Sequence, residues 1–121
     1  MIKDIAFTAY PAKDVRALRD WYANTLGLQF GAPWEEGDKL QYDEAAVGTG
    51  TFSVMTADWM EVAPGSASAV AFEVDDIDEQ KSWLEGKHIE VSDVYDTPVC
   101  RVATFRDPEG NKVTIHQSTR H

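Results

Sequence analysis

The chain has 121 residues, of which 43% are hydrophobic and 26% are charged. This length fits one compact domain, and the apolar content is enough for a buried core, which excludes a disordered chain. Eleven Lys and Arg residues stand against 21 Asp and Glu residues, a formal net charge of −10. Such a surface repels phosphate backbones, so nucleic acid is not an expected partner.

The sequence favours the cytoplasm as the location of the protein. A single cysteine, Cys100, excludes an intrachain disulfide framework. The first ten residues are too short and too polar for a signal peptide, and no apolar run is long enough to cross a membrane. We therefore expect neither secretion nor a membrane partner.

The first half of the chain predicts one strand, one helix and three further strands. Residues 2–10 alternate as a strand does. Asp14 is a suitable N-cap, because its carboxylate can accept the free amide hydrogens of a first helical turn. Gly27 can take the left-handed conformation that ends the helix. The apolar helix face and the later strands are Val15, Leu18, Trp21, Tyr22 and Leu26, followed by 28–34, 39–47 and 51–56.

The second half predicts the same order. A strand at 69–74 precedes a helix that begins at Asp75 or Asp76 and ends at Gly86. Ile77, Leu84 and Trp83 are expected on its inner face. Strands follow at 91–95, 99–105 and 112–117, and the segment 107–111, Asp-Pro-Glu-Gly-Asn, predicts a tight hairpin turn between the last two.

The two halves match at an offset of 62 residues, which indicates a duplication. Asp14 falls on Asp76, Trp21-Tyr22 fall on Trp83-Leu84, and a glycine closes each helix. The predicted fold is α+β, with two tandem βαβββ modules that form a curved mixed sheet, or cup, with the helices outside. One domain spans 1–121, with module 1 at about 1–57, a linker at 57–66 and module 2 at about 67–118.

Three segments resemble a known family. Residues 14–28, 71–76 and 107–111 are similar to the first helix, the second-module opening and the hairpin of the vicinal oxygen chelate superfamily. That superfamily includes glyoxalase I, bleomycin-resistance proteins, fosfomycin-resistance transferases and extradiol dioxygenases. The resemblance implies the cup-shaped fold, but this fold hosts binders, lyases, isomerases, transferases and oxygenases alike.

The resemblance also implies where a divalent metal would be held, because most of the family's enzymes use His, Gln or Glu on the first and last strands of each module. The matching positions here are Phe7, Ala69 and Thr114. Phe and Ala cannot bind a metal, and a neutral Thr is a poor substitute for a carboxylate. We therefore expect no metal and no other cofactor.

Strand alternation suggests what the cup presents instead. If Phe7 and Thr114 face inward, Glu73 and His116 do so as well, and Arg101, Ala103 and Phe105 line the adjacent strand. Four aromatic residues in less regular segments are expected at the rim. The expected ligand-binding residues are Phe7, Trp34, Tyr42, Trp59, Glu73, Tyr95, Arg101, Phe105, Thr114 and His116.

Other reactive residues have simpler interpretations. His116 could act as a general base or join Glu73 in a displaced metal site, although a structural histidine is the commoner case. His88 and the pair Glu35-Glu36 are expected at the surface, and Cys100 is expected to be a buried, unreactive thiol. No residue is assigned a catalytic role.

These inferences favour a metal-free protein of the bleomycin-resistance type that sequesters a small organic ligand, cationic or aromatic. The resemblance implies a homodimer, whose cups form within each chain or by exchange of modules between chains. Two alternatives stay open. One is a metal-dependent lyase, isomerase or dioxygenase with displaced ligands, and the other is a regulatory module with a vestigial cup.

Overall fold

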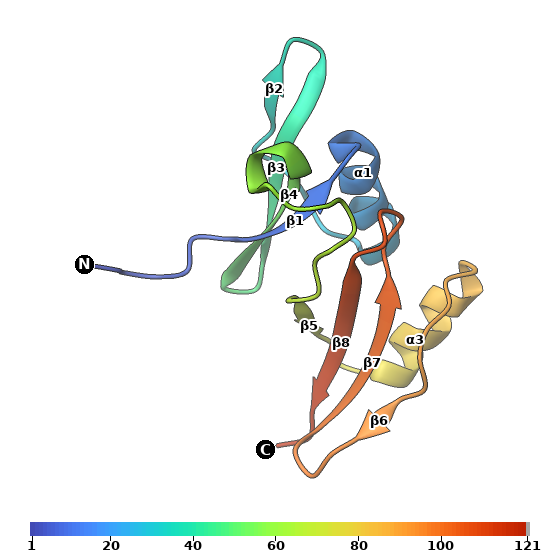
Figure 1. Cartoon of the computed structure of the whole chain (residues 1–121). Coiled ribbons are helices and arrows are strands. Elements are labelled where there is room, and N and C mark those ends of the chain that lie inside the picture. Colours follow the sequence, from blue (N-terminus) through green and yellow to red (C-terminus); the bar gives the residue numbers. More distant parts are fainter. Residues whose placement is uncertain (121) are drawn as a thin grey trace. The chain divides into compact units, whose positions relative to one another are not determined.

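The computed structural model describes residues 1–120, and His121 lies outside the described part. Two βαβββ series follow one another, with a short helix between them (Figure 1). The elements are β1 (Thr8–Ala12), α1 (Val15–Leu26), β2 (Trp34–Glu36), β3 (Lys39–Val47), β4 (Gly50–Thr56), α2 (Ala57–Met60), β5 (Ala71–Glu73), α3 (Ile77–Gly86), β6 (Tyr95–Asp96), β7 (Cys100–Arg106) and β8 (Lys112–Ser118). The predicted α+β fold of two modules is confirmed.

The chain forms two compact units. The first contains residues 1–67 together with 108–111, and the second contains residues 68–107 and those from 112 onward. The strand orders are β1-β4-β3-β2 and β5-β8-β7-β6, so the two sheets share one topology. In each, the first strand pairs in parallel with the last, and the remaining pairs are antiparallel.

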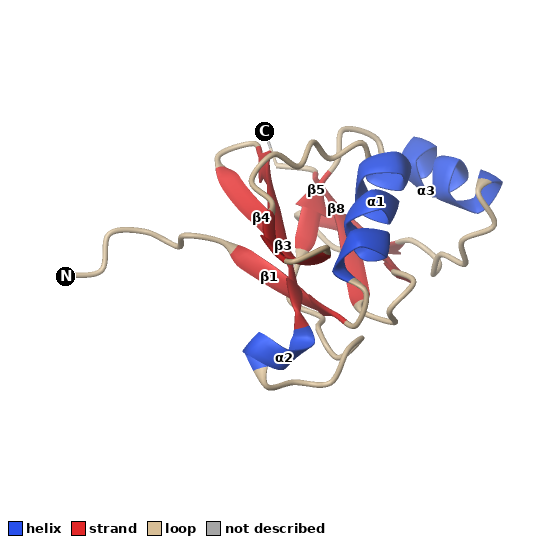
Figure 2. Cartoon of the chain, turned by 90° about the horizontal axis from the view of Figure 1, so that it is seen from above, coloured by secondary structure: helices blue, strands red, loops and turns tan. Residues whose placement is uncertain are grey.

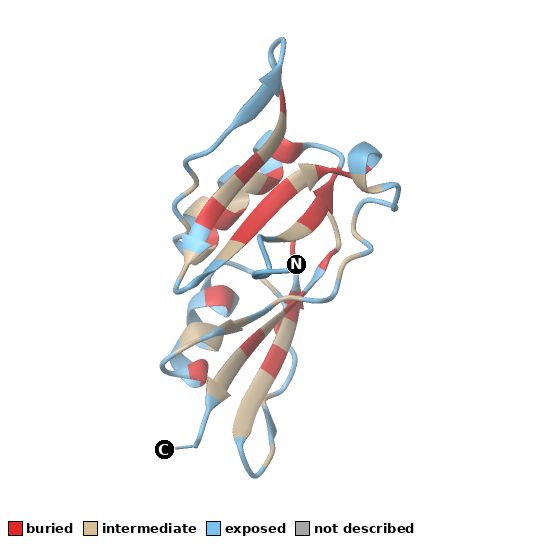
Figure 3. Cartoon of the chain, turned by 90° about the vertical axis from the view of Figure 1, so that its left-hand side faces the viewer, coloured by how far each residue is buried: buried red, intermediate tan, exposed pale blue. Residues whose placement is uncertain are grey.

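In the first unit, α1 covers one face of the sheet (Figure 2). Tyr10 and Tyr22 are fully buried there and both contact the ring of Phe52, at centroid distances of 5.4 and 4.9 Å. Burial of each such ring contributes about 1.5–3 kcal/mol. Figure 3 shows the buried stretch along β1, β3 and β4 and the exposed hairpin between β2 and β3.

A buried ion pair joins α1 to the same face of this sheet. Arg19 Nη1 donates to Asp43 Oδ2 at 2.8 Å, and Asp43 Oδ1 accepts from the amides of Ala32 and Glu44. Asp43 is 1% exposed. The carboxylate thus accepts three hydrogen bonds, one of them from a cation, and such pairing is what makes a buried carboxylate tolerable.

In the second unit, α3 packs Ile77 and Leu84 against the sheet, and both side chains are fully buried. The sheet contributes four further buried side chains: Ala103, Phe105, Val113 and Ile115. Their alternation along β7 and β8 follows the strand period of two. This set is the core of the second unit.

Both long helices start as the sequence predicts. The Asp14 carboxylate accepts from the amide of Ala17, and the Asp76 carboxylate accepts from the amide of Glu79, each at 3.1 Å. Gly27 follows α1 with φ 72°, in the left-handed region that glycine tolerates. Gly86, by contrast, is the last helical residue of α3, and the left-handed residue beyond it is His88, with φ 64°.

Several predicted strands are shorter in the structure. The first begins at Thr8 rather than at residue 2, and residues 1–7 extend from the sheet without pairing with any described strand (Figure 1). Of the strand predicted at 28–34, only Phe30 bridges Ala45 before β2 begins. The strand predicted at 91–95 is reduced to β6, and the linker at 57–66 contains α2. The three shortened strands are β1, β2 and β6, which lie at sheet edges, where pairing is least constrained.

The hairpin turn at 107–111 has a second role that the sequence did not reveal. Its residues 108–111 belong to the first unit. Glu109 Oε1 accepts from the amides of Lys13 and Asp14 at 2.9 Å each. The fully buried Asn111 side chain accepts from the amide of Ala67 and donates to the carbonyl of Pro11. The turn residues thus satisfy backbone groups of residues 11–14, just before α1, and of Ala67.

Candidate functional site

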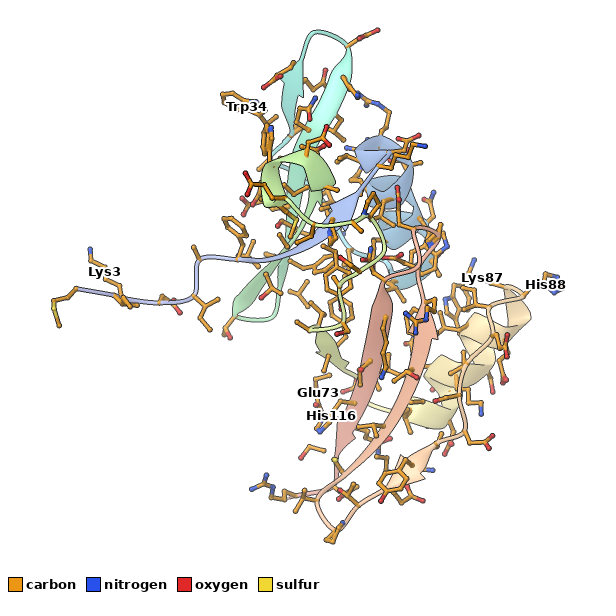
Figure 4. All side chains as sticks on the ribbon, in the orientation of Figure 1. Lys3, Trp34, Glu73, Lys87, His88 and His116 are labelled. Atoms are coloured by element: carbon orange, nitrogen blue, oxygen red, sulfur yellow. The ribbon has the colours of Figure 1, made fainter. Side chains whose placement is uncertain are left out.

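The sheet face of the first unit that α1 leaves uncovered carries an aromatic row. Trp34, Tyr42, Met55 and Pro11 are aligned across β2, β3, β4 and β1 by the strand register. Trp34 is 59% exposed and points away from α1 (Figure 4). Phe7, which is 43% exposed, meets the Tyr42 ring edge-on at 5.7 Å. We call this surface the open face of the first unit.

A small polar group lies within this face. The Tyr42 hydroxyl donates to Glu44 Oε1 at 3.0 Å. Ser53, which is fully buried, pairs with Glu44 across β3 and β4. Its hydroxyl makes no hydrogen bond of ordinary geometry, although it is near enough to the phenol to favour the ionised form. Burial raises the pKa of Tyr42, and the Glu44 carboxylate adds to that increase against the opposing effect of Ser53.

The second unit has an equivalent row. Glu73, His116, Val102 and Tyr95 are aligned across β5, β8, β7 and β6. Glu73 and His116 lie side by side (Figure 4), with Glu73 Oε1 and His116 Nδ1 2.5 Å apart. Glu73 Oε2 accepts from the amide of Ser118 at 2.7 Å. The Ser118 amide and, next, His116 lower the pKa of Glu73, which favours its carboxylate form.

The predicted ligand-binding residues are distributed over both units. Phe7, Trp34 and Tyr42 are together on the open face of the first unit, and Trp59 is 47% exposed on α2. Glu73, Thr114, His116 and Tyr95 share one face of the second sheet, because Thr114 and His116 are two residues apart on β8. Tyr95 is 69% exposed.

The predicted orientation of the strand at 99–105 is wrong. Ala103 pairs with Ile115 and Phe105 pairs with Val113, so these residues lie in the core with α3. Arg101 is on the same face, where it donates to Asp78 of α3 at 2.9 Å and to Asp96 at 2.7 Å. The Asp78 and Asp96 carboxylates raise the pKa of Arg101. Arg101 therefore joins α3 and β6 to the sheet rather than lining the opposite face.

The structure also gives the exposure of the other residues that the sequence analysis discussed. Trp83, expected in the core, is 54% exposed, and Lys87 Nζ lies 4.6 Å from its ring centroid. His88 is exposed as expected, and Glu35 is exposed in an ion pair with Arg16. Cys100, expected to be buried, is partly exposed, with Sγ 3.1 Å from the hydroxyl of Thr97.

The residues at the family's metal positions do not fit a metal ion. Phe7 and Ala69 offer no donor atom, and Thr114 on β8 offers a neutral hydroxyl. Among residues 1–120, no three His, Cys, Asp or Glu side chains are grouped closely enough to hold a metal. The Glu73 and His116 pair supplies two donors and lacks a third.

Comparison with known proteins decides the family. The model of the Glyoxalase/Bleomycin resistance protein/Dioxygenase superfamily matches residues 4–115. The chain belongs to this superfamily. No curated protein sequence matches the chain.

Several solved structures are similar over nearly the whole chain. TnmS3, an antibiotic binding protein from Streptomyces sp. CB03234, is 25% identical with a TM-score of 0.82, and 98% of each chain is covered. A lactoylglutathione lyase from Agrobacterium tumefaciens is 22% identical with a TM-score of 0.77, covering 97% of this chain and 95% of that one. FosX, a fosfomycin resistance protein from Listeria monocytogenes, is 14% identical with a TM-score of 0.72, covering 98% and 96%. The last two likenesses concern the fold alone.

Within residues 1–120, the helices are too short or too polar to cross a bilayer.

Proposed function

We propose that this superfamily member is a metal-free binding protein that sequesters a small organic molecule. The carrying observation is the open face of the first unit, where Phe7 and Trp34 remain 43% and 59% exposed beside Tyr42. Large aromatic side chains that are held on a sheet and exposed to solvent are typical of a ligand surface. Contact with a ligand removes their apolar surface from water, which makes binding more favourable.

Two further observations support the proposal. TnmS3, one of the similar structures, is described as an antibiotic binding protein, which makes an antibiotic a reasonable ligand class for this chain. The net charge of −10 favours a cationic ligand over an anionic one. The side chains of Phe7 and Ala69 have no atom that can bind a metal, which supports binding without one.

Tryptophan fluorescence tests the proposal directly. A panel of amphipathic and aromatic small molecules, antibiotics included, should change the emission of the wild-type protein. A Trp34→Phe variant should lose most of that change, because Trp34 is on the open face. Trp83→Phe is the matched control, since Trp83 is exposed to a similar extent (54%) on the outer surface of α3. A response that survives in Trp34→Phe and vanishes in Trp83→Phe would contradict the proposed surface.

A lyase, isomerase or dioxygenase with displaced metal ligands is the second candidate. The observation in its favour is the contact between Glu73 and His116, in which the Ser118 amide also fixes the carboxylate. Such a pair holds an imidazole in one orientation, as an acid or base requires. Metal analysis after exhaustive dialysis separates the two candidates: one equivalent of a transition metal that is lost in His116→Gln would favour the enzyme.

A homodimer is part of the proposed function. The segment before β1 exposes Met1, Ile2 and Ile5, the last at 80%, and β1 is an edge strand. An apolar extended segment next to a free edge is suited to pairing with a second copy. Light scattering should give the mass of two chains for the wild type and of one for Ile5→Lys. Val62→Lys, at an exposed apolar residue of the same unit, should remain dimeric. The cytoplasmic location stays a prediction.

A further inference from the structure

Glu44 stands out on the open face of the first unit because its charge has no counterpart. It is on β3, and the register aligns it with Ser53 on β4. None of the ion pairs within residues 1–120 includes Glu44. Its Oε1 accepts only the Tyr42 hydroxyl, and its Oε2 accepts no hydrogen bond from the described residues. One carboxylate oxygen is thus available to an outside donor.

The surroundings of this carboxylate are aromatic and apolar rather than acidic. Strand alternation places nine residues of β1, β3 and β4 on this face, and Glu44 alone among them is charged: Ala9, Pro11, Leu40, Tyr42, Glu44, Ala46, Thr51, Ser53 and Met55. Phe7 stands at 70° to the Tyr42 ring, so the two rings present differently oriented surfaces. A lone carboxylate within such a group differs from the oxygen-rich sets that divalent metals prefer.

Two polar side chains neighbour Glu44 on this face, Ser53 and Tyr42. Ser53 is fully buried and its hydroxyl lacks a hydrogen bond of ordinary geometry. An unpaired buried hydroxyl is uncommon, because most buried polar side-chain atoms in proteins have a hydrogen-bond partner. The Tyr42 hydroxyl donates to Glu44 Oε1, so the phenol orients the carboxylate and keeps Oε1 engaged.

We propose that Glu44, Tyr42 and Phe7 form a subsite for an organic cation, a protonated or quaternary amine. The carboxylate of Glu44 would oppose the charge, while the rings of Tyr42 and Phe7 contact the carbon groups around the nitrogen. Aromatic faces attract such cations, and the attraction grows when water is excluded. This inference rests on the proposed function and narrows its ligand class. It also assigns a role to Glu44, which composition alone could not single out among 21 acidic residues.

A pair of isosteric probes tests the charge. Choline carries a trimethylammonium group, and 3,3-dimethylbutan-1-ol has the same shape with a neutral carbon in place of nitrogen. Titrations followed by two-dimensional NMR measure millimolar binding and report which residues shift. We expect choline to bind more tightly than its neutral analogue, with the largest shifts at Tyr42, Glu44 and Ser53.

Glu44→Gln removes the charge and keeps an oxygen that can accept from Tyr42. It should weaken choline binding by roughly fivefold, the range of a partly exposed ion pair, and leave the neutral analogue unaffected. Glu36→Gln is the control, because Glu36 is exposed on β2 and this substitution removes the same charge from the protein. An unchanged choline affinity in Glu44→Gln, or an equal loss in Glu36→Gln, would overturn the inference.

The same titrations distinguish failure of this inference from failure of the proposed function. If neutral aromatic molecules shift the open-face residues as strongly as choline does, the binding function stands and the cation subsite is refuted. If neither class shifts these residues and the fluorescence panel is also silent, both are refuted. Far-ultraviolet circular dichroism of each variant confirms that loss of binding does not reflect unfolding.

Discussion

Asn111→Ala tests the role of the 108–111 turn in the first unit. The side chain is fully buried, with Oδ1 accepting from the Ala67 amide at 3.0 Å and Nδ2 donating to the Pro11 carbonyl at 3.2 Å. Truncation leaves both backbone groups without this partner. Each unsatisfied buried group costs about 1–3 kcal/mol, and the lower end applies to the partly exposed Ala67. We expect the free energy of unfolding to fall by about 2–4 kcal/mol.

Urea denaturation followed by tryptophan fluorescence and circular dichroism measures this change. Asn24→Ala is the matched control, because Asn24 is exposed on α1 and alanine favours a helix. The control should stay within about 0.5 kcal/mol of the wild type. A loss below 1 kcal/mol in Asn111→Ala, with an unchanged denaturant slope, would refute the idea that this amide stabilises the first unit.

Three other predictions concern the backbone, the helix caps and pH. Gly65→Ala should destabilise the protein by more than 2 kcal/mol in the same assay, because φ is +79° and an added Cβ would lie 2.1 Å from the carbonyl oxygen of Glu109; wild-type stability would contradict this. Asp14→Ala and Asp76→Ala should each cost about 1 kcal/mol, and a Ser replacement at either site should restore most of it. The carboxyl carbon of Glu73 should titrate by NMR below its usual pKa. Because that pKa is lowered by folding, the stabilising contribution of Glu73 is present above the unfolded value and is lost as pH falls through the folded one, so Glu73→Gln should match the wild type in strong acid and be less stable at neutral pH.

The fold could be predicted because its signals are local and repeated. Asp14 and Asp76 cap helices through the same side-chain contact, three residues ahead in each case. The longest predicted strand, 39–47, matches β3 at both ends. Both signals are patterns of residues close together in the chain, so they can be recognised in the sequence before the partners of these elements are known. Edge strands such as β6 depend instead on whether a partner is available, and the sequence does not contain that information.

The prediction of which sheet face the β7 side chains occupy was wrong for a different reason. A shift of one residue turns every side chain of a strand to the opposite face. The match at 62 residues holds for β1 and β5, where Pro11 corresponds to Glu73, but Met55 and His116, which pair with these two residues, are 61 apart. An exact repeat therefore cannot assign faces in the later strands. The clue that could have helped is Ala103 with Phe105, since a small and a large apolar residue in alternation favour the covered face.

The same reasoning explains why Glu44 escaped the sequence analysis and Glu73 did not. Glu73 was found through its spacing from a position known from the family, whereas Glu44 follows Asp43 in a polar stretch that alternates across the sheet. Asp43 and Glu44 are neighbours in the chain but lie on opposite faces of the sheet. Asp43 pairs with Arg19 of α1, whereas Glu44 is on the face with the aromatic side chains, where it accepts from Tyr42. Arg19→Met would leave the buried Asp43 carboxylate without its counter-charge, so this variant should lose about 3 kcal/mol or more of unfolding free energy. Glu44→Gln should cost less than 1 kcal/mol, and comparable losses in these two variants, measured by urea denaturation, would show that the face assignment of β3 is wrong.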